Sequence, residues 1–417
     1  MKNKNVKPVI ICLSNQFFDL PLKTNKHLVM QKLADRGYKV IFVDPPTRFK
    51  FIKNFFKTKK FSLIDKQSEN LFVYRPVNFL GFFPFTYVSN LLHVFVIKRL
   101  VRRLQSKHSN IVLWVYHFDF PRVFDLDKGL NPAVFIYDVV DDYQSFPEYS
   151  KRDITNTGIV KYFQLVDRFF KEILDQKGKS GKEWVMYREK QLAKRANLMF
   201  ASHPYLYEKF KKLKKNTQYV PNAGQFDLYY KKIKGIPKEL IDIKKPIVGY
   251  SGALDAYKFD VDLFLYAAKN SPEINYVLIG PMQLSDSNPK VLELKNLKNV
   301  HLVGVKTSEE TAHFTQNFDA YTIPYQTNSY VQHGCFPIKF FNALSSGVPV
   351  VVSNLTAYKG FENVLYIAKS KEEYLEMIKK AVKDKSIIKA KERIKVASKN
   401  TWDDKVNKQL KAIRFYI

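Results

Sequence analysis

Cysteine is scarce in this chain. Only Cys12 and Cys335 occur among the 417 residues, and they are far apart in the sequence. Two distant cysteines provide neither a disulfide framework nor the paired spacing of a zinc site. Free thiols are typical of a reducing compartment. We therefore expect a cytoplasmic protein without a disulfide scaffold and without a metal centre.

Several other common features are also missing. The apolar run at residues 9–13 is too short for a secretion signal and instead predicts a first strand. The loop after it lacks the GxGxxG fingerprint, which argues against a dinucleotide site there. No repeat of solenoid period and no low-complexity segment is present. These observations favour a first strand over a signal peptide and argue against a repeat protein and against a dinucleotide site after that strand.

Residues 77–97 lack Asp, Glu, Lys and Arg over 21 positions, a length that could cross a bilayer. However, Gly81 and Pro84 interrupt the run, and basic residues follow its amphipathic second half. We predict a loop followed by a helix that lies against the protein or in a membrane interface, and not a membrane span.

Acidic residues are few compared with basic ones. The 39 Asp and Glu face 69 Lys and Arg, which gives a formal net charge of +30, and the chain also holds 34 Phe and 25 Tyr. A charge of this size carries information about binding partners but not about the fold. It is compatible with binding to nucleic acid, to an anionic membrane or to phosphorylated substrates. Cations mixed with aromatic rings suit a membrane interface at least as well as nucleic acid.

The mixture is densest at residues 48–61, where six Lys or Arg stand among five Phe. The alternative is a solvent-exposed segment that only connects two elements, since most runs of charged residues are solvent-exposed. We predict a patch that faces the membrane and the acceptor, because Phe gains from the acyl boundary while Lys meets anionic headgroups. Its members are Arg48, Lys50, Lys53, Phe55, Phe56 and Lys57.

The length and the order of apolar segments predict two α/β domains of about 200 residues each. Buried strands alternate with helical segments in both halves, as in a doubly wound sheet. The predicted parts are a first domain at 1–222, a linker at 223–244, a second domain at 245–400, and a helix at 401–417 that packs back on the first domain. Expected strands lie at 8–13, 38–44, 71–74, 111–116, 134–137, 198–202, 247–249, 276–279, 300–302, 320–323, 348–352 and 365–367, with helices at 26–35 and 261–269.

Residues 334–353 predict a loop, a short helix and a buried strand. Pro337 suits the first helical position, and Gly347 suits the left-handed end of the helix. Lys339 and Asn342, three residues apart, share one face. A helix start with free amides and a lysine is a natural diphosphate site, and Asn342 could bind a ribose. The alternative is an ordinary helix and strand with an exposed lysine.

Carboxylates follow the strand at 134–137. Because ligands of parallel sheets bind at the carboxyl ends of strands, Asp141 and Asp142 are candidates for chemistry there. His117, at the end of the strand at 111–116, should reach the same crevice. The alternatives are that both aspartates cap the following helix and that His117 is a hydrogen-bonded structural residue.

The order of these motifs resembles the GT-B glycosyltransferases that use nucleotide-activated sugars. Within that group the chain looks most like cell-surface polysaccharide enzymes of the teichuronic-acid biosynthesis type and the xanthan glucuronosyltransferase, of the group 1 superfamily. The segments that carry the likeness are 16–46, 137–147, 192–210, 219–230, 248–281, 319–325 and 336–355.

The resemblance implies two Rossmann-like domains facing across a cleft, with the donor in the second, the acceptor in the first, and neither metal nor other cofactor. Lys339 would contact the phosphates, and Gly252 would form the turn that approaches them. Where many members have a ribose-binding glutamate, this chain has Asn342, so the nucleotide stays open. The other residues that match donor-binding positions are Tyr325 and Ile338 for the nucleoside and Lys258 as a second cation.

We therefore predict an enzyme at the inner face of the cell membrane, attached peripherally to an anionic surface. It would move a hexosyl or glucuronosyl group from a UDP-linked donor to a lipid-linked or cell-surface glycan. Asp141 or Asp142, with His117 as a rival, would be the general base if the configuration inverts. The alternatives are a non-catalytic GT-B protein and a basic nucleic-acid-binding protein, but no nucleic-acid module is present, so no nucleic acid is expected as a partner.

Overall fold

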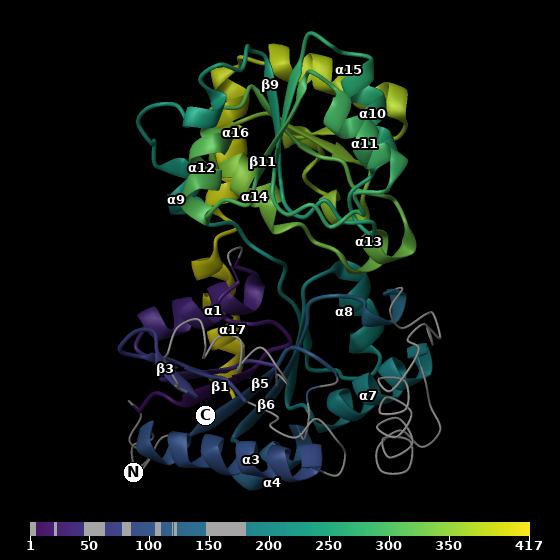
Figure 1. Ribbon diagram of the computed structural model, residues 1–417. Helices are drawn as coiled ribbons and strands as arrows, with labels where there is room; N and C mark the ends of the chain where they lie inside the picture. The colour runs from purple at the N-terminus through teal and green to yellow at the C-terminus, as the bar shows by residue number, and fades with distance from the viewer. Residues whose placement is uncertain are drawn as a thin grey trace. The chain divides into compact units, whose positions relative to one another are not determined.

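The structure is a computed structural model that describes residues 6–20, 23–45, 63–76, 85–104, 110–118, 120, 123–146 and 181–417 (Figure 1). Contacts divide the chain into two compact units, which are treated separately below. The N-terminal unit comprises Met1–Leu20, Lys26–Val220 and Val406–Ile417, and the C-terminal unit comprises Pro21–Asn25 and Pro221–Lys405.

The N-terminal unit is built on an eight-stranded sheet with the order β3-β4-β2-β1-β5-β6-β7-β8. All neighbouring strands are parallel except β3, which runs antiparallel to β4. The strands are β1 Val9–Leu13, β2 Val40–Val43, β3 Ile64–Lys66, β4 Leu71–Tyr74, β5 Ile111–Val115, β6 Val134–Val139, β7 Leu198–Ala201 and β8 Thr217–Tyr219.

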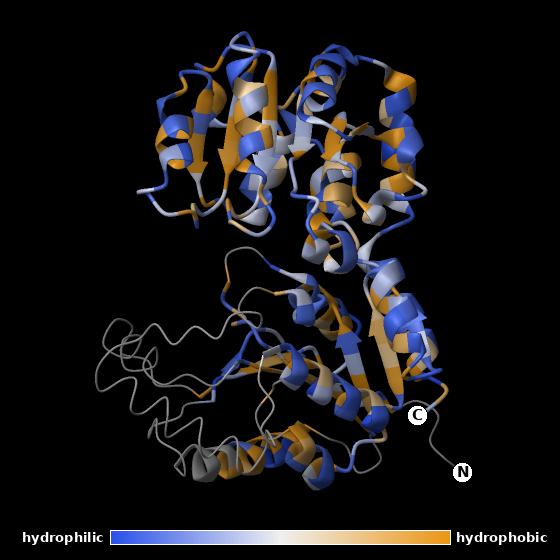
Figure 2. Ribbon diagram, turned by 90° about the vertical axis from the view of Figure 1, so that its right-hand side faces the viewer, coloured by the Kyte–Doolittle hydropathy of each residue, from blue (hydrophilic) through white to orange (hydrophobic). Residues whose placement is uncertain are grey.

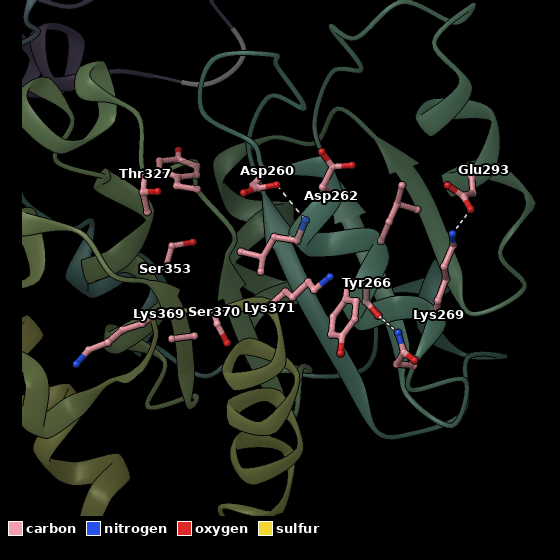
Figure 3. A pocket seen from close by; sticks show the side chains of 15 residues that line it. Asp260, Asp262, Tyr266, Lys269, Glu293, Thr327, Ser353, Lys369, Ser370 and Lys371 are labelled. Atoms are coloured by element: carbon pink, nitrogen blue, oxygen red, sulfur yellow. Dashed lines mark hydrogen bonds and ion pairs between the residues drawn. The ribbon is translucent and has the colours of Figure 1, made fainter.

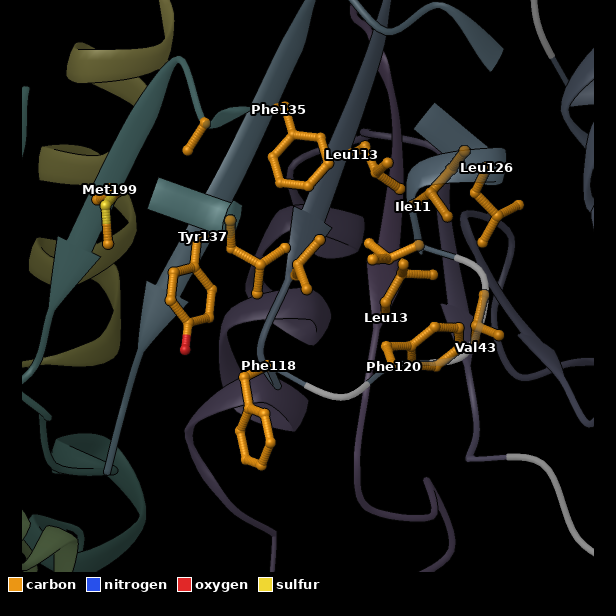
Figure 4. Packing of buried hydrophobic residues seen from close by; sticks show 14 of the residues in the cluster. Ile11, Leu13, Val43, Leu113, Phe118, Phe120, Leu126, Phe135, Tyr137 and Met199 are labelled. Atoms are coloured by element: carbon orange, nitrogen blue, oxygen red, sulfur yellow. The ribbon is translucent and has the colours of Figure 1, made fainter. Parts of the chain in front are cut away.

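The central strands of this sheet are buried along their whole length. This explains why their sequences are continuous apolar runs and not alternating ones, as expected for a parallel sheet covered on both faces. Leu13, Leu113 and Tyr137, from β1, β5 and β6, belong to one hydrophobic cluster on one face (Figure 4). The opposite face carries the even-numbered residues of β1, including Cys12, which is buried.

Helices α3, α4, α7 and α8 belong to the N-terminal unit, α1 belongs to it from Lys26 onward, and the last helix, α17, joins it from Val406 onward. Gln409 Nε2 on α17 donates to Asp138 Oδ2 at 3.2 Å, and Tyr416 Oη donates to the Asn197 carbonyl at 3.1 Å. The bounds are α1 Asn25–Asp35, α3 Phe85–Leu104, α4 Val123–Leu130, α7 Gly181–Arg195, α8 Pro204–Lys211 and α17 Trp402–Ile413, with a 3₁₀ turn η1 at Tyr143–Ser145.

The C-terminal unit contains a six-stranded parallel sheet with the order β11-β10-β9-β12-β13-β14. Its strands are coloured mostly as hydrophobic, whereas the helices around them mix both colours (Figure 2). The strands are β9 Ile247–Ser251, β10 Asn275–Ile279, β11 Val300–Gly304, β12 Ala320–Ile323, β13 Val350–Ser353 and β14 Tyr366–Ala368.

Side-chain caps fix the starts of most helices in this unit. Asp260 caps α10 by accepting from Leu263 N at 2.9 Å, and Thr307 with Glu310 forms a capping box on α12. The helices are α9 Phe226–Tyr230, α10 Val261–Lys269, α11 Pro289–Asn296, α12 Ser308–Gln316, α13 Ser329–Gly334, α14 Ile338–Ser345, α15 Lys371–Lys383 and α16 Ile387–Ser398, with 3₁₀ turns η3 Lys238–Leu240, η4 Thr356–Tyr358 and η5 Glu362–Val364.

Two local predictions need correction. Pro337 is the N-cap of α14, with extended backbone at φ −69° and ψ 118°, and not its first helical residue. Residues 334–337 are also not wholly a loop, because Gly334 ends α13. The prediction for Gly347 is confirmed, since its φ of 75° ends α14 in the left-handed region.

The predicted linker at 223–244 holds α9 and η3, and Gln316 Nε2 of α12 donates to the Tyr229 carbonyl of α9 at 2.8 Å. From residues 77–97, the described part belongs to α3. Among the described helices, none is long and apolar enough to cross a membrane.

Candidate functional site

The strand order of the N-terminal sheet reverses between β1 and β5. In open α/β sheets, such a switch point opens a crevice at the carboxyl ends of the strands, where ligands bind. Lys26 lies in the first turn of α1, His117 follows β5, and Asp141 follows the adjacent β6. This topology places His117 and the aspartates at one edge of one sheet, and their sharing of one crevice stays a prediction.

Lys26 brings a buried cation to this edge. Its Nζ donates to Asn15 Oδ1 at 2.7 Å and to Gln16 Oε1 at 3.1 Å, and it lies 5.8 Å from the centre of the Tyr116 ring. Burial lowers the pKa of Lys26 to about 8, and the negative charge of Asp141 opposes that decrease. Asp141 is therefore the carboxylate that stabilises this cation most.

The two adjacent aspartates have different environments. Asp142 is buried, and its Oδ1 accepts from Lys209 Nζ at 2.7 Å while Ser145 Oγ donates to its Oδ2. Asp142 is the N-cap residue of η1 but makes no capping hydrogen bond through its side chain, so the capping alternative is wrong for it. Asp141 is only partly buried. Asp142 thus has a structural ion pair, and Asp141 is the one more open to a ligand.

His117 is held between aromatic rings. Its ring centroid lies 4.4 Å from that of Phe118 and 4.7 Å from that of Tyr143, whose Oη donates to the Tyr116 carbonyl at 2.9 Å. Burial, together with the positive charge of Lys26, lowers the pKa of His117 to about 3. The imidazole is therefore neutral near pH 7, but with so low a pKa it is a weaker base than the rival prediction requires.

Sequence reasoning missed a third carboxyl group at this edge. Glu189 of α7 is buried, and its Oε2 accepts from Gln144 Nε2 at 2.7 Å and lies 3.8 Å from Lys209 Nζ. Burial raises the pKa of Glu189 to about 7, against the opposing effect of Lys209. Little in the sequence indicated this group. Glu189 and Lys209 belong to helices rich in charged residues, and only the fold brings them close to Asp142.

The strand order of the C-terminal sheet reverses between β9 and β12, and several of the residues predicted to bind the donor lie near this switch point. Lys339 Nζ lies 4.1 Å from the centre of the Tyr250 ring and 5.1 Å from that of Tyr325. Gly252, just after β9, has φ 145°, and a Cβ built on it would stand 2.1 Å from Lys339 Nζ. The structure therefore brings together Gly252, Tyr325 and Lys339, which the sequence separates by up to 87 positions.

Lys339 forms no ion pair with any residue that the structure describes. Burial lowers its pKa to about 7, and the positive charge of Lys258 lowers it further, while Asp255 opposes both effects. A partly charged amine that lies over aromatic rings, without a bound carboxylate, is suited to an anionic ligand. Gly252 leaves room at the amine because it has no side chain.

Three other predicted donor residues lie around this group. Lys258 Nζ lies 5.6 Å from the centre of the Tyr330 ring, and Ile338 begins α14, partly exposed. Asn342 is buried one turn along α14, where its Oδ1 accepts from Gln225 N at 2.8 Å. The carboxamide oxygen of Asn342 is thus already engaged inside the unit, and ribose binding by this residue stays a prediction.

A cavity of about 550 Å³ lies beside this group in the C-terminal unit. Side chains from α10, from the ends of β13 and β14 and from the start of α15 line it, among them Asp260, Ser353 and Lys371 (Figure 3). Tyr325 lines the cavity and also lies near Lys339. The space beside these residues is lined by both polar and apolar atoms and is large enough for part of a small ligand.

Within the described ranges, no group of three or more His, Cys, Asp or Glu side chains is arranged to hold a metal ion. The predicted membrane patch, with Arg48, Lys50, Lys53, Phe55, Phe56 and Lys57, lies outside the described residues. Metal independence and the patch both stay predictions.

Comparison with known proteins finds a family model that matches most of the C-terminal unit. Residues 232–401 match the glycosyl transferases group 1. TuaH of Bacillus subtilis (strain 168), assigned to teichuronic acid biosynthesis as a glycosyltransferase, is 27% identical over 172 residues. That alignment spans 40% of this chain and 43% of TuaH.

Solved structures match over almost the whole chain. Sucrose-phosphate synthase from Thermosynechococcus elongatus has a TM-score of 0.64 at 15% identity and covers 98% of both chains. Anabaena HepE, solved in complex with UDP and glucose, has a TM-score of 0.64 at 14% identity and covers 98% of this chain and 99% of its own. The predicted α/β fold of the GT-B type is confirmed.

Proposed function

Because residues 232–401 match the glycosyl transferases group 1 and the fold is of the GT-B type, we propose that the chain transfers a sugar from a nucleotide-sugar donor to a glycan acceptor. The observation that supports this most directly is the Lys339 amine beside the Gly252 turn, with Tyr250 and Tyr325 around it. A diphosphate would supply the negative charge that this amine lacks.

The finer parts of the proposal rest on the likeness to TuaH and on the composition of the chain. HepE is solved with UDP and glucose, which favours a UDP-linked hexosyl or glucuronosyl donor here. The acceptor would be a lipid-linked or cell-surface polysaccharide, reached from the inner face of an anionic membrane to which the protein attaches peripherally. The net charge of +30 supports that location. No metal would be needed, because Lys339 and helix amides can neutralise the leaving group.

In the proposed reaction, the acceptor hydroxyl oxygen bonds to the anomeric carbon while the bond from that carbon to the diphosphate oxygen breaks. The electron pair leaves with the nucleoside diphosphate, whose negative charge Lys339 stabilises. If the configuration inverts, Asp141 accepts the hydroxyl proton. Asp141 is suited to that step because it is a carboxylate at the strand edge whose negative charge acts on the neighbouring Lys26.

The test is turnover of a panel of nucleotide sugars by the wild type and Lys339→Ala. We expect at least one donor to be hydrolysed or transferred, and kcat to fall about 100-fold in the variant because one stabilising charge on the leaving group is lost. Lys359→Ala, which removes an exposed lysine from the same unit, is the control and should keep wild-type turnover. Equal activity of Lys339→Ala and wild type on every donor would refute the role of Lys339.

Donor affinity should depend on pH through Lys339. The free protein has a Lys339 pKa of about 7, and a bound diphosphate raises it, so binding takes up a proton. Affinity should be highest below pH 7 and should weaken by up to about tenfold per pH unit above it. The diphosphate of a nucleotide sugar is esterified at both ends and keeps its charge over this range.

Calorimetric titration with UDP-glucose between about pH 6 and pH 9 measures this dependence. Lys339→Arg is the matched control, because guanidinium stays protonated throughout and should bind without the pH dependence. An affinity of the wild type that is flat across the range would contradict the pH prediction.

A further inference from the structure

Helix α3, Phe85–Leu104, is firmly packed on one face. Ile97, Leu100 and Val101 are buried, and His93 Nδ1 lies 2.7 Å from the hydroxyl of Tyr74 on β4. A helix advances by about 100° per residue, and these four side chains fall within one arc of about 100°. This inner face fixes which side of α3 is turned to solvent.

The outer face of α3 is apolar where a solvent-facing helix should be polar. Leu91, Leu92 and Phe95 are 44%, 52% and 57% exposed. They lie within about 100° of one another around the helix and roughly opposite the buried stripe. Single exposed apolar residues are normal, but three large ones in contact range on one helix form a patch, and such patches mark interaction surfaces.

Cations continue the same face toward the end of the helix. Arg99, Arg102 and Arg103 are exposed. Phe95 and Arg99 are four residues apart, and so are Arg99 and Arg103, so the side chains follow one another along one stripe. At about 1.5 Å per residue, the apolar part and the cationic part together extend about 18 Å along the surface.

We propose that this outer face of α3 docks onto an anionic lipid bilayer. Burial of leucine and phenylalanine side chains at the boundary of the acyl chains is favourable. The guanidinium groups of arginines beside them can reach the phosphates of lipid headgroups. The surface defined by Leu91, Leu92, Phe95, Arg99, Arg102 and Arg103 is named the α3 face. The proposal deepens the proposed function, and rests on it only in naming the membrane as the place of the acceptor.

Charge decides between a bilayer and a second copy of the chain. Each copy carries a formal net charge of +30 and adds three arginines at the α3 face itself. Two copies joined through this face would bring those arginines together, which costs free energy. An anionic headgroup layer has the opposite charge, and each basic residue near it strengthens binding.

The test uses flotation of the full chain with vesicles of phosphatidylglycerol and phosphatidylcholine, compared with phosphatidylcholine alone. We expect binding to the anionic vesicles that falls about tenfold or more in Leu91→Ser/Leu92→Ser/Phe95→Ser and about 100-fold in Arg99→Glu/Arg102→Glu/Arg103→Glu. Matched controls lie in the C-terminal unit: Ile387→Ser/Ile388→Ser removes side chains that are 71% and 72% exposed, and Lys231→Glu/Lys232→Glu/Lys234→Glu makes the same change of charge on exposed lysines.

Wild-type binding to neither vesicle, or equal losses in the control variants, would overturn the proposal. So would a loss of dimer mass by light scattering in the α3 variants, which would assign the face to a second copy. Phe95→Trp tests the same surface without removing it: its fluorescence should be quenched by brominated lipids in anionic vesicles, and absence of quenching also counts against docking.

Donor hydrolysis without vesicles separates this inference from the proposed function. It should stay at the wild-type level in every α3 variant, which also shows that the variants are folded. Vesicle binding without donor turnover would support docking through the α3 face and would refute the proposed glycosyltransferase activity. Donor turnover without vesicle binding would support the activity and would refute docking.

Discussion

Gly252→Ala should abolish most donor turnover while leaving the protein folded. The added Cβ would stand 2.1 Å from Lys339 Nζ and 3.1 Å from Lys339 Cε, so the lysine must move away. The end of a lysine side chain moves at little cost, and the fold should therefore survive. However, the amine then leaves its place near the rings of Tyr250 and Tyr325, and a methyl group takes the space proposed for the diphosphate. We expect kcat/KM to fall about 1000-fold, more than for Lys339→Ala, because position and space are lost together.

The backbone of Gly252 needs a separate control. Its φ of 145° lies in the region that other residues rarely adopt, so alanine adds strain of about 1 kcal/mol or more. Gly360→Ala carries a similar penalty, since its φ is 88°, but a Cβ there would meet no atom within 4 Å. Thermal melting should show a modest loss in both variants, and steady-state kinetics should show a loss in Gly252→Ala alone. Equal kinetics in the two variants would mean that the close approach to Lys339 has no functional role.

Much of the fold was predictable because the central strands are buried on both faces. The predicted strands at 71–74 and 320–323 coincide with β4 and β12, and the predicted helix at 261–269 coincides with α10. A continuous apolar run predicts the two strands, and an Asp cap before an apolar helical pattern predicts the helix. Neither pattern is compatible with many other structures. Local sequence was sufficient in these segments, where most of a strand or one whole helix face is buried.

Two of the elements that were missed are a strand at a sheet edge and a helix of five residues. β3, Ile64–Lys66, pairs only with β4 and is not buried, so its sequence carries no apolar run. α9, Phe226–Tyr230, lies in the polar stretch that was predicted as a linker, and it is fixed by Gln316 of α12. Both elements are determined by tertiary contacts and not by local propensity. Such contacts cannot be seen in the pattern of a single sequence.

The proximity of Gly252 to Lys339 was more predictable from the sequence than the arrangement of charged groups around Asp141 and Asp142. The local sequence marks both residues, since Gly252 lies in a turn after a strand and Lys339 lies at the start of a helix. The fold then brings the two residues together. Lys26 and Glu189 have no such local signal. Their character comes from burial beside Asp141 and Asp142, which depends on residues distant in the sequence.

Asp142→Asn tests the structural member of the aspartate pair. It leaves the Lys209 amine without its closest anion, and Glu189 Oε2 is 3.8 Å away. We expect the free energy of unfolding to fall by about 2 kcal/mol, because removing one partner of a buried ion pair is costly. Denaturant titration measures this change, and Asp142→Asn/Lys209→Met should recover part of it since both charges are then absent. The turnover of folded Asp142→Asn should stay within about threefold of wild type.

Asp141→Asn should give the opposite result. Its side chain is only partly buried and its charge acts on Lys26, so the loss of that charge should change unfolding by less than about 1 kcal/mol. If the reaction inverts configuration, removal of the general base should lower kcat about 1000-fold while donor binding is kept. Proton abstraction at Asp141 and ion pairing at Asp142 are thus separable by measuring kcat and stability on the same two variants. Unchanged kcat in Asp141→Asn would show that Asp141 is not the base, and a loss of kcat in Asp142→Asn alone would exchange the two roles.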